Sequence, residues 1–170
     1  MTAFTLRDER PGDEDAIAAV TRAAFEHHPH SRQTEAFIVA ALRRAGALAL
    51  SLVAEEADGR IVGHVAFSPV TVSDGSLGWY GLGPVSVAPK LQRRGIGSAL
   101  ITQGLQRLRA LGAQGCVLVG EPGYYARFGF RAEAALQLPG VPPEYFMSLP
   151  LGPTRASGTV VFHPAFEATG

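Results

Sequence analysis

This sequence of 170 residues has a single cysteine, Cys116, which excludes a disulfide within the chain and favours a reducing compartment. Neither sign of charge is in excess, because 15 basic residues balance 15 acidic ones, so no overall field attracts nucleic acid or an anionic membrane. No apolar run reaches the roughly 18 residues of a membrane span. Charged residues occupy positions 7–10, where a signal peptide needs an apolar core. These absences predict a cytoplasmic protein with no nucleic acid and no membrane as partner.

Two common nucleotide-binding motifs are also missing. A Walker-type loop needs a Gly-Lys pair, which the chain does not contain, and the dinucleotide fingerprint needs a glycine where Leu100 stands. Three histidines, His27, His28 and His30, lie close together, but no acidic or cysteine partner stands at ligand spacing nearby. We therefore predict no metal site, and we interpret this segment as a solvated or substrate-facing loop.

Hydrophobic residues make up 46% of the chain, which is enough to build a packed core. Apolar spacing and turn signals predict strands alternating with helices, and hence one α/β domain over residues 1–170 with a mixed sheet. Asp58-Gly59 predicts a hairpin. The predicted strands cover residues 4–6, 49–56, 60–72, 79–87, 115–120, 145–151 and 159–162. The predicted helices begin after Asp13 as N-cap, cover residues 37–45 and 97–111, and begin again at Pro122.

Several residues are assigned to the interior. His64 is interpreted as a strand histidine satisfied by hydrogen bonds, with a role in an active site as the alternative. Cys116 is predicted to be a small buried side chain. The third helix carries apolar residues at helical spacing, which predicts core positions rather than a cofactor site. These residues are Leu100, Ile101, Leu105, Leu108 and Leu111.

The stretch from Val85 to Leu100 carries the strongest functional signal. It reads as a strand end, a short basic loop and a helix that begins near Gly97, with Gln92 and Gly95 completing Gln-x-x-Gly-x-Gly. The first turn of a helix presents unpaired N–H groups and partial positive charge, which suit a phosphate. The loop therefore predicts a ligand with a pyrophosphate, and a glycine-rich helix start with solvated arginines is the alternative. The cations that add charge here are Lys90, Arg93 and Arg94.

This order of strand, loop and helix closely resembles the acyl-CoA-binding motif of the GNAT superfamily of N-acyltransferases. That motif is Val-x-Pro, a short gap and Gln/Arg-x-x-Gly-x-Gly/Ala, and residues 87–89 and 92–97 match it fully. A second element of the family, Tyr-x-x-x-Gly-Phe, is matched by Tyr125, Gly129 and Phe130. The resemblance covers most of the chain and is best over residues 4–150.

The resemblance implies a GNAT fold, in which a mixed central sheet is flanked by helices and acetyl-CoA is gripped between the fourth and fifth strands. It implies that the backbone of Val85, Ser86 and Val87 binds the pantetheine and acetyl groups. Gly83-Pro84 would supply the distortion that opens the sheet for the pantetheine arm. The residues implied to surround the pyrophosphate are Arg93, Arg94, Gly95, Ile96, Gly97 and Ser98.

The resemblance also implies catalytic residues. Tyr125 matches the tyrosine that donates a proton or hydrogen bond to the departing CoA thiolate. Its neighbour Tyr124 is an alternative candidate for this role, and a further alternative is that both tyrosines only pack against other aromatic residues. Glu121 follows a strand directly and is the predicted base for the amine. It is also readable as a carboxylate that merely favours the next helix N-terminus. The histidines of residues 27–30 are a further alternative for the base.

Two departures from the family pattern keep other interpretations open. Many members carry Asn where this chain has Leu118, and the strand over residues 79–87 contains no acid. We expect an N-acetyltransferase that transfers acetyl from acetyl-CoA to a primary amine of a small molecule or peptide. The alternatives are an acyl-CoA-binding sensor without efficient turnover and an interaction protein without cofactor. Residues 27–32 and 139–146 would line the acceptor side; the oligomeric state is left open, a homodimer included.

Overall fold

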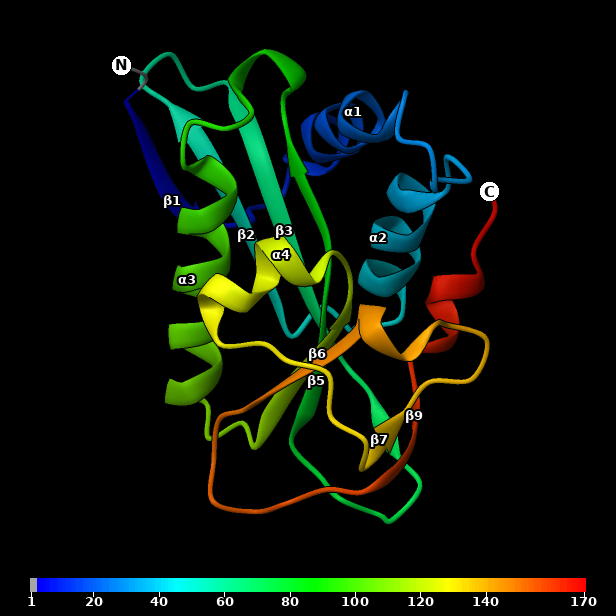
Figure 1. Cartoon of the computed structure of the whole chain (residues 1–170). Coiled ribbons are helices and arrows are strands. Elements are labelled where there is room, and N and C mark those ends of the chain that lie inside the picture. Colours follow the sequence, from blue (N-terminus) through cyan, green and yellow to red (C-terminus); the bar gives the residue numbers. More distant parts are fainter. Residues whose placement is uncertain (1–2) are drawn as a thin grey trace. The chain divides into compact units, whose positions relative to one another are not determined.

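The computed structural model describes residues 3–170, which alternate between strands and helices (Figure 1). The strands are β1 (Phe4–Asp8), β2 (Leu50–Glu56), β3 (Ile61–Pro69), β4 (Thr71–Val72), β5 (Trp79–Val87), β6 (Gly115–Val119), β7 (Leu136–Gln137), β8 (Phe146–Pro150) and β9 (Gly158–Val161). The α-helices are α1 (Glu14–Phe25), α2 (Glu35–Arg44), α3 (Ile96–Ala110) and α4 (Pro122–Tyr125). Single 3₁₀ turns cover Pro89–Leu91, Ala126–Phe128, Pro143–Tyr145 and Pro164–Glu167.

The chain forms two compact units, which are described separately. The first contains the described residues up to Phe67 together with residues 83–104 and 164–170, and the second contains residues 68–82 and 105–163. Strand β5 and helix α3 each contribute residues to both units. Strands and helices are mixed in both, so the predicted α/β class with a mixed sheet is confirmed. The extent of the predicted domain, residues 1–170, stays a prediction.

In the first unit, β1, β2 and β3 form an antiparallel meander. The registers pair Phe4 with Glu56 and Leu50 with Phe67. The predicted hairpin is confirmed: Gly59 has φ of 89°, a left-handed conformation that glycine adopts without steric cost.

The two faces of this meander are covered by different helices. On one face, Val53 of β2 packs with Ile17 of α1 and Val39 of α2. On the other face, Gly63 of β3 lies against α3, because a Cβ built on this glycine would come within 2.9 Å of the Ile96 Cγ2 atom. The side-chain alternation of β3 therefore divides the unit into an α1–α2 side and an α3 side.

Ion pairs tie the N-terminal strand to its neighbours. The Arg7 guanidinium is 2.8 Å from Asp13 and 2.8 Å from Glu55, and these hydrogen bonds hold the pKa of both carboxyls below their ordinary values. Asp13 stands at the predicted N-cap position of α1, but its side chain makes no capping bond. The predicted N-cap position is confirmed, but the side chain does not cap the helix, because Asp13 Oδ2 accepts from Arg7 and from the Arg10 amide instead.

In the second unit, β6 lies parallel to β5 over Trp79–Gly81 and antiparallel to β8. A small separate sheet has the order β4-β9-β7. The prediction of one strand over residues 60–72 is wrong, because β3 ends at Pro69 and β4 pairs with β9 in the small sheet. Proline has no N–H to donate, which suits a strand end. The core of this unit is formed by Val70, Val72, Trp79, Val117, Leu136, Phe146 and Val160.

Two predictions for single residues have opposite outcomes. Cys116 is fully buried, as predicted, and burial raises the pKa of its thiol well above the ordinary value. Leu111 is 61% exposed, so its prediction as a core residue is wrong. It follows the last residue of α3, where the chain turns at Gly112 with φ of 83°. Among residues 3–170, no helix combines the length and apolar character needed to cross a bilayer.

Candidate functional site

The loop that precedes α3 has an unusual backbone. Arg93 and Gly95 both have positive φ, 66° and 88°, on either side of Arg94. The Gly95 carbonyl then accepts the first helical hydrogen bond, from the Ala99 amide at 3.0 Å. The helix therefore begins at Ile96, one residue before the predicted start. The amides of the first helical turn have no acceptor within the helix, and the helix dipole gives them partial positive charge. The turn therefore directs donors toward the exposed loop.

Charge is concentrated in the same segment. Lys90, Arg93 and Arg94 are all exposed, and Gly95 beside them is exposed as well, so an anion can approach the backbone. Gln92 fixes the loop, because its side-chain Nε2 donates to the Val87 carbonyl at 3.1 Å. The combination of backbone donors, full positive charge and a missing Cβ fits a phosphate or pyrophosphate.

The end of β5 leads into this loop. Val85 and Val87 are half-buried, whereas Ser86 between them is 1% exposed. Ser86 is therefore enclosed by the protein, and the backbone contact with a ligand that the resemblance implies stays a prediction. These residues lie beyond the stretch of β5 that pairs with β6. Gly83, two residues earlier, has φ of 138°, which marks a distortion of the strand at the predicted place.

Tyr125 lies in the second unit, in the short helix α4. Its ring packs edge-on against Tyr124 at 4.9 Å and near Phe130 at 6.3 Å between ring centroids. Gly120 lies directly beneath the ring, because a Cβ built there would overlap the Tyr125 Cε2 and Cδ2 atoms. Burial, with a smaller effect of Tyr124, raises the pKa of the Tyr125 phenol to about 12. The hydroxyl is therefore protonated at neutral pH and acts as a hydrogen-bond donor.

The rival tyrosine is held differently. The Arg127 guanidinium carbon lies 4.5 Å from the centre of the Tyr124 ring, a cation–π contact, and Arg127 Nε donates to the Tyr124 carbonyl at 2.9 Å. Phe128 packs edge-on against the same ring at 5.6 Å. Tyr124 is thus engaged by its own helical turn, which favours Tyr125 as the tyrosine that meets a ligand.

Glu121, the predicted base, and Leu118, which replaces the usual Asn of the family, both come shortly before α4 in the sequence. Glu121 is exposed and occupies the N-cap position of α4 without a side-chain capping bond. The structure thus brings Glu121 and Tyr125 onto one short element, while the assignment of Glu121 as base stays a prediction. Leu118 is 2% exposed and paired with Met147 across β6 and β8. The residue that replaces the usual Asn is therefore a core side chain.

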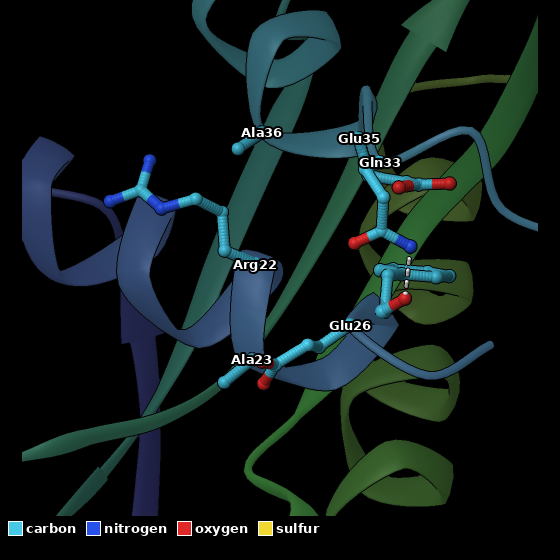
Figure 2. Close-up of a pocket in the computed structure, with 7 residues that line it drawn as sticks. Arg22, Ala23, Glu26, Gln33, Glu35 and Ala36 are labelled. Carbon is cyan, nitrogen blue, oxygen red and sulfur yellow. Dashed lines mark hydrogen bonds between the residues drawn. The ribbon is translucent and has the colours of Figure 1, made fainter.

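A pocket that the sequence did not predict is lined by residues just before and just after the histidine segment 27–30. A cavity of about 380 Å³ lies between the end of α1 and the start of α2, and Figure 2 shows side chains of both segments around it. Gln33, with φ of 64°, donates its Nε2 hydrogen to the Phe25 carbonyl at 2.7 Å. The cavity is lined by Arg22, Ala23, Phe25, Glu26, Gln33, Glu35 and Ala36. Within residues 3–170, no cluster of histidine, cysteine and acidic residues has the arrangement of a metal site.

Comparison with known proteins identifies the family. The model of the Acetyltransferase (GNAT) domain matches residues 5–132. The chain is 39% identical over 129 residues to "Uncharacterized N-acetyltransferase YhbS" of Escherichia coli (strain K12), covering 76% of this chain and 74% of that protein. It is similar to the crystal structure of a GNAT family acetyltransferase from Brucella melitensis in complex with acetyl-CoA. That likeness has a TM-score of 0.87 and 50% identity, and covers 98% of this chain and 100% of the other.

A second solved structure, of YhbS from Escherichia coli in complex with CoA, has a TM-score of 0.90 and 34% identity, and covers 100% of this chain and 95% of that one. The match of the family model covers more than half of the chain, and both structures agree with it in fold. The chain therefore belongs to the GNAT superfamily of N-acetyltransferases, as the motifs around Gly95 and Tyr125 implied.

Proposed function

We propose that this protein transfers the acetyl group of acetyl-CoA to a primary amine. The observation that carries the proposal is the loop of residues 93–98, where positive φ angles, exposed cations and the start of α3 combine into a pyrophosphate cradle. The relatives from Brucella melitensis and Escherichia coli, solved with acetyl-CoA and CoA, support the choice of ligand. In this proposal Arg93 to Ser98 hold the pyrophosphate, while Val85, Ser86 and Val87 hold the pantetheine and acetyl groups.

The reaction needs three things from the chain. The amine nitrogen attacks the thioester carbonyl carbon, a C–N bond forms, the C–S bond breaks, and CoA leaves as a thiolate. The amine must lose a proton, the oxyanion needs hydrogen-bond donors, and the thiolate needs a proton or a donor. Holding both reactants in place can contribute several kcal/mol, roughly 7–11 in favourable cases. Positioning of the thioester is thus the first task of the protein.

Tyr125 serves the leaving group. A free thiol has a pKa of about 8.5, whereas burial raises the pKa of the Tyr125 phenol to about 12. Full proton transfer from the phenol to the thiolate is therefore uphill, and a strong hydrogen bond is the role that fits. We assign the amine proton to Glu121, directly or through water, with the histidines of residues 27–30 as the alternative base.

The acceptor enters the cavity between α1 and α2. Two carboxylates, Glu26 and Glu35, line it together with one guanidinium, that of Arg22, so the lining favours a cationic ligand. Figure 2 shows the side-chain oxygen of Gln33 turned toward the space between the two helices, where it can accept a hydrogen bond from an ammonium group. The cavity volume of about 380 Å³ suits a compact amine rather than a folded partner. A small amine or the exposed end of a peptide meets these conditions.

Release of free CoA from acetyl-CoA across a panel of amines tests the proposal. We expect thiol release that depends on a small amine, with the acetylated amine as product by mass spectrometry. A panel without turnover, combined with calorimetric CoA binding, would instead support the acyl-CoA sensor, which the absence of an acid in β5 keeps as the second candidate. Absence of CoA binding would contradict both.

A further inference from the structure

A chain of hydrogen-bonded polar side chains runs inward on the α1–α2 side of the first unit, from half-buried residues to the buried His64. Arg43 of α2 donates twice to Glu9, from Nε at 2.7 Å and from Nη2 at 2.8 Å. The Ser51 hydroxyl lies 2.7 Å from Glu9 Oε1 and 2.8 Å from Nε2 of His64. His64 is fully buried, and it faces the same side as Val53, its partner across β2 and β3. The chain thus runs from a helix to the middle of β3.

The direction of each hydrogen bond in this chain can be worked out. Burial alone would raise the pKa of Glu9, but the bonds from Arg43 and Ser51 hold it below its ordinary value, so the carboxylate only accepts. The single hydroxyl proton of Ser51 therefore goes to Glu9. The Nε2 atom of His64 must then carry a proton and donate it to the Ser51 oxygen. Burial lowers the pKa of His64 to about 4, so the ring is neutral and Nδ1 is a bare acceptor.

This acceptor has no partner among residues 3–170. The Nδ1 atom of His64 is buried without a hydrogen bond, and so is the hydroxyl of Ser86 on β5. A buried polar atom without a partner is destabilising, so two such atoms on neighbouring strands call for a physical explanation. One of them needs a donor, and the other has a proton to donate.

The strand register brings these two residues together. Strands β3 and β5 are hydrogen-bonded neighbours, and the Ala88 amide, just after β5, donates to the Val62 carbonyl near the start of β3 at 2.9 Å. The end of β5 therefore lies beside the start of β3, so the two strands are antiparallel. His64 lies two residues after Val62 on β3, and Ser86 lies two residues before Ala88 on β5, so the two residues are directly opposite each other. Directly opposite residues of an antiparallel pair share one face, with Cβ atoms roughly 4.5–5.5 Å apart.

We propose that the Ser86 hydroxyl is the donor to Nδ1 of His64, either directly after rotation of the Ser86 side chain or through one buried water, and that His64 is a positioning residue for β5. Every proton in the resulting chain points toward Glu9: Ser86 to His64, His64 to Ser51, and Ser51 to Glu9. The chain anchors β5 at the middle of the segment Val85–Val87 to the α1–α2 side of the unit. The positioning role rests on the proposed function, whereas the hydrogen bond itself does not.

Nitrogen NMR of the imidazole tests the hydrogen bond without any ligand. The chain has five histidines, and loss of one signal in His64→Gln assigns the resonance of His64. We expect a neutral ring protonated on Nε2, with an Nδ1 shift that moves toward that of an unbonded nitrogen in Ser86→Ala. A proton on Nδ1, or an Nδ1 shift that is unchanged in Ser86→Ala, would overturn the proposal. The wild-type spectrum gives the tautomer even where a variant folds poorly.

Calorimetric binding of CoA tests the positioning role. One hydrogen bond is worth about 0.5–1.5 kcal/mol, so we expect Ser86→Ala to weaken CoA binding by about 3- to 10-fold. In the His64→Gln background the same change should have little further effect, because the link is already broken. Ser68→Ala is the matched control, since Ser68 is another fully buried serine whose hydroxyl has no hydrogen bond within residues 3–170.

The outcomes separate the two ideas. Equal CoA affinity in wild type and Ser86→Ala, or an equal loss in Ser68→Ala, would contradict the positioning role. Absence of CoA binding in the wild type would contradict the proposed function and with it the positioning role, and the imidazole spectrum would still decide the hydrogen bond. The imidazole spectrum therefore tests the hydrogen bond separately from the CoA-binding experiment, which tests the positioning role.

Discussion

Gly104 allows a sharp prediction about packing in the first unit. It lies in the interior of α3, where glycine costs about 1 kcal/mol relative to alanine by helix propensity. A Cβ built on Gly104 would overlap ring atoms Cε1 and Cζ of Phe67, which is fully buried at the other side of the contact. Because protein interiors are closely packed, relieving this overlap would require the buried ring, α3 or β3 to shift.

The size of the effect follows from two opposing contributions. Alanine gains about 1 kcal/mol from helix propensity, but overpacking a tight core costs about 1–3 kcal/mol. The overlap falls on a rigid aromatic ring rather than on a flexible chain end, so the cost belongs at the upper end of that range. We expect Gly104→Ala to lower the free energy of unfolding by about 1–2 kcal/mol and the Tm by about 2–8 °C.

Urea unfolding followed by circular dichroism measures this change. Gly123→Ala in α4 is the matched control, because a Cβ there has nothing within 4 Å, and it should be neutral or slightly stabilising. Replacing Phe67 by Leu in the Gly104→Ala background should cost less than the sum of the single changes. Stabilisation by about 1 kcal/mol in Gly104→Ala, or strict additivity with Phe67→Leu, would refute the packing argument.

Three other predictions concern the candidate site and the ion pairs. Gly95→Asp should abolish calorimetric CoA binding in a folded protein, because it strains a positive φ and brings an anion to the phosphates; unchanged binding would remove the phosphate-loop interpretation. Tyr125→Phe should lower turnover by about 10- to 1,000-fold with little change in CoA affinity, and a loss in Tyr124→Phe instead would move the role. The lowered pKa of Asp13 contributes stability that is present above its ordinary pKa and lost as the pH falls through the folded value. The acid-induced loss of stability should therefore be smaller in Arg7→Gln, and an identical pH profile would exclude the pair.

The parts of the site that are local in sequence were predictable. The loop at Gly95 and the turn at Gly59 depend on backbone conformations that few residues adopt, so the residue type reveals them. The short helix at Tyr125 begins at Pro122, which suits a first helical turn. These features need no knowledge of distant partners, and the family motif includes two of them.

The features that were missed depend on tertiary partners. Leu111 continues the helical period of the core leucines, but it comes after the end of α3, where nothing buries it. Asp13 is the N-cap residue that the sequence predicts, but its carboxylate binds Arg7 and not a helix amide, which the sequence did not indicate. The α1–α2 cavity depends on how two helices meet, and Glu26 and Glu35 in its lining resemble ordinary surface residues in the sequence. A glutamine that holds a positive φ, Gln33, could not be recognised from its type.

Two residues other than glycine have a positive φ within residues 3–170, Gln33 at 64° and Arg93 at 66°. Each such residue costs roughly 1–2 kcal/mol that glycine would avoid. Selection for folding alone would therefore favour glycine at Arg93, whereas at Gln33 the side-chain hydrogen bond to the Phe25 carbonyl offsets the gain. A screen for heat-resistant variants should return Arg93→Gly, and this variant should lose affinity for CoA. The gain in stability of Arg93→Gly then measures the folding free energy that the chain gives up to keep an arginine at this position.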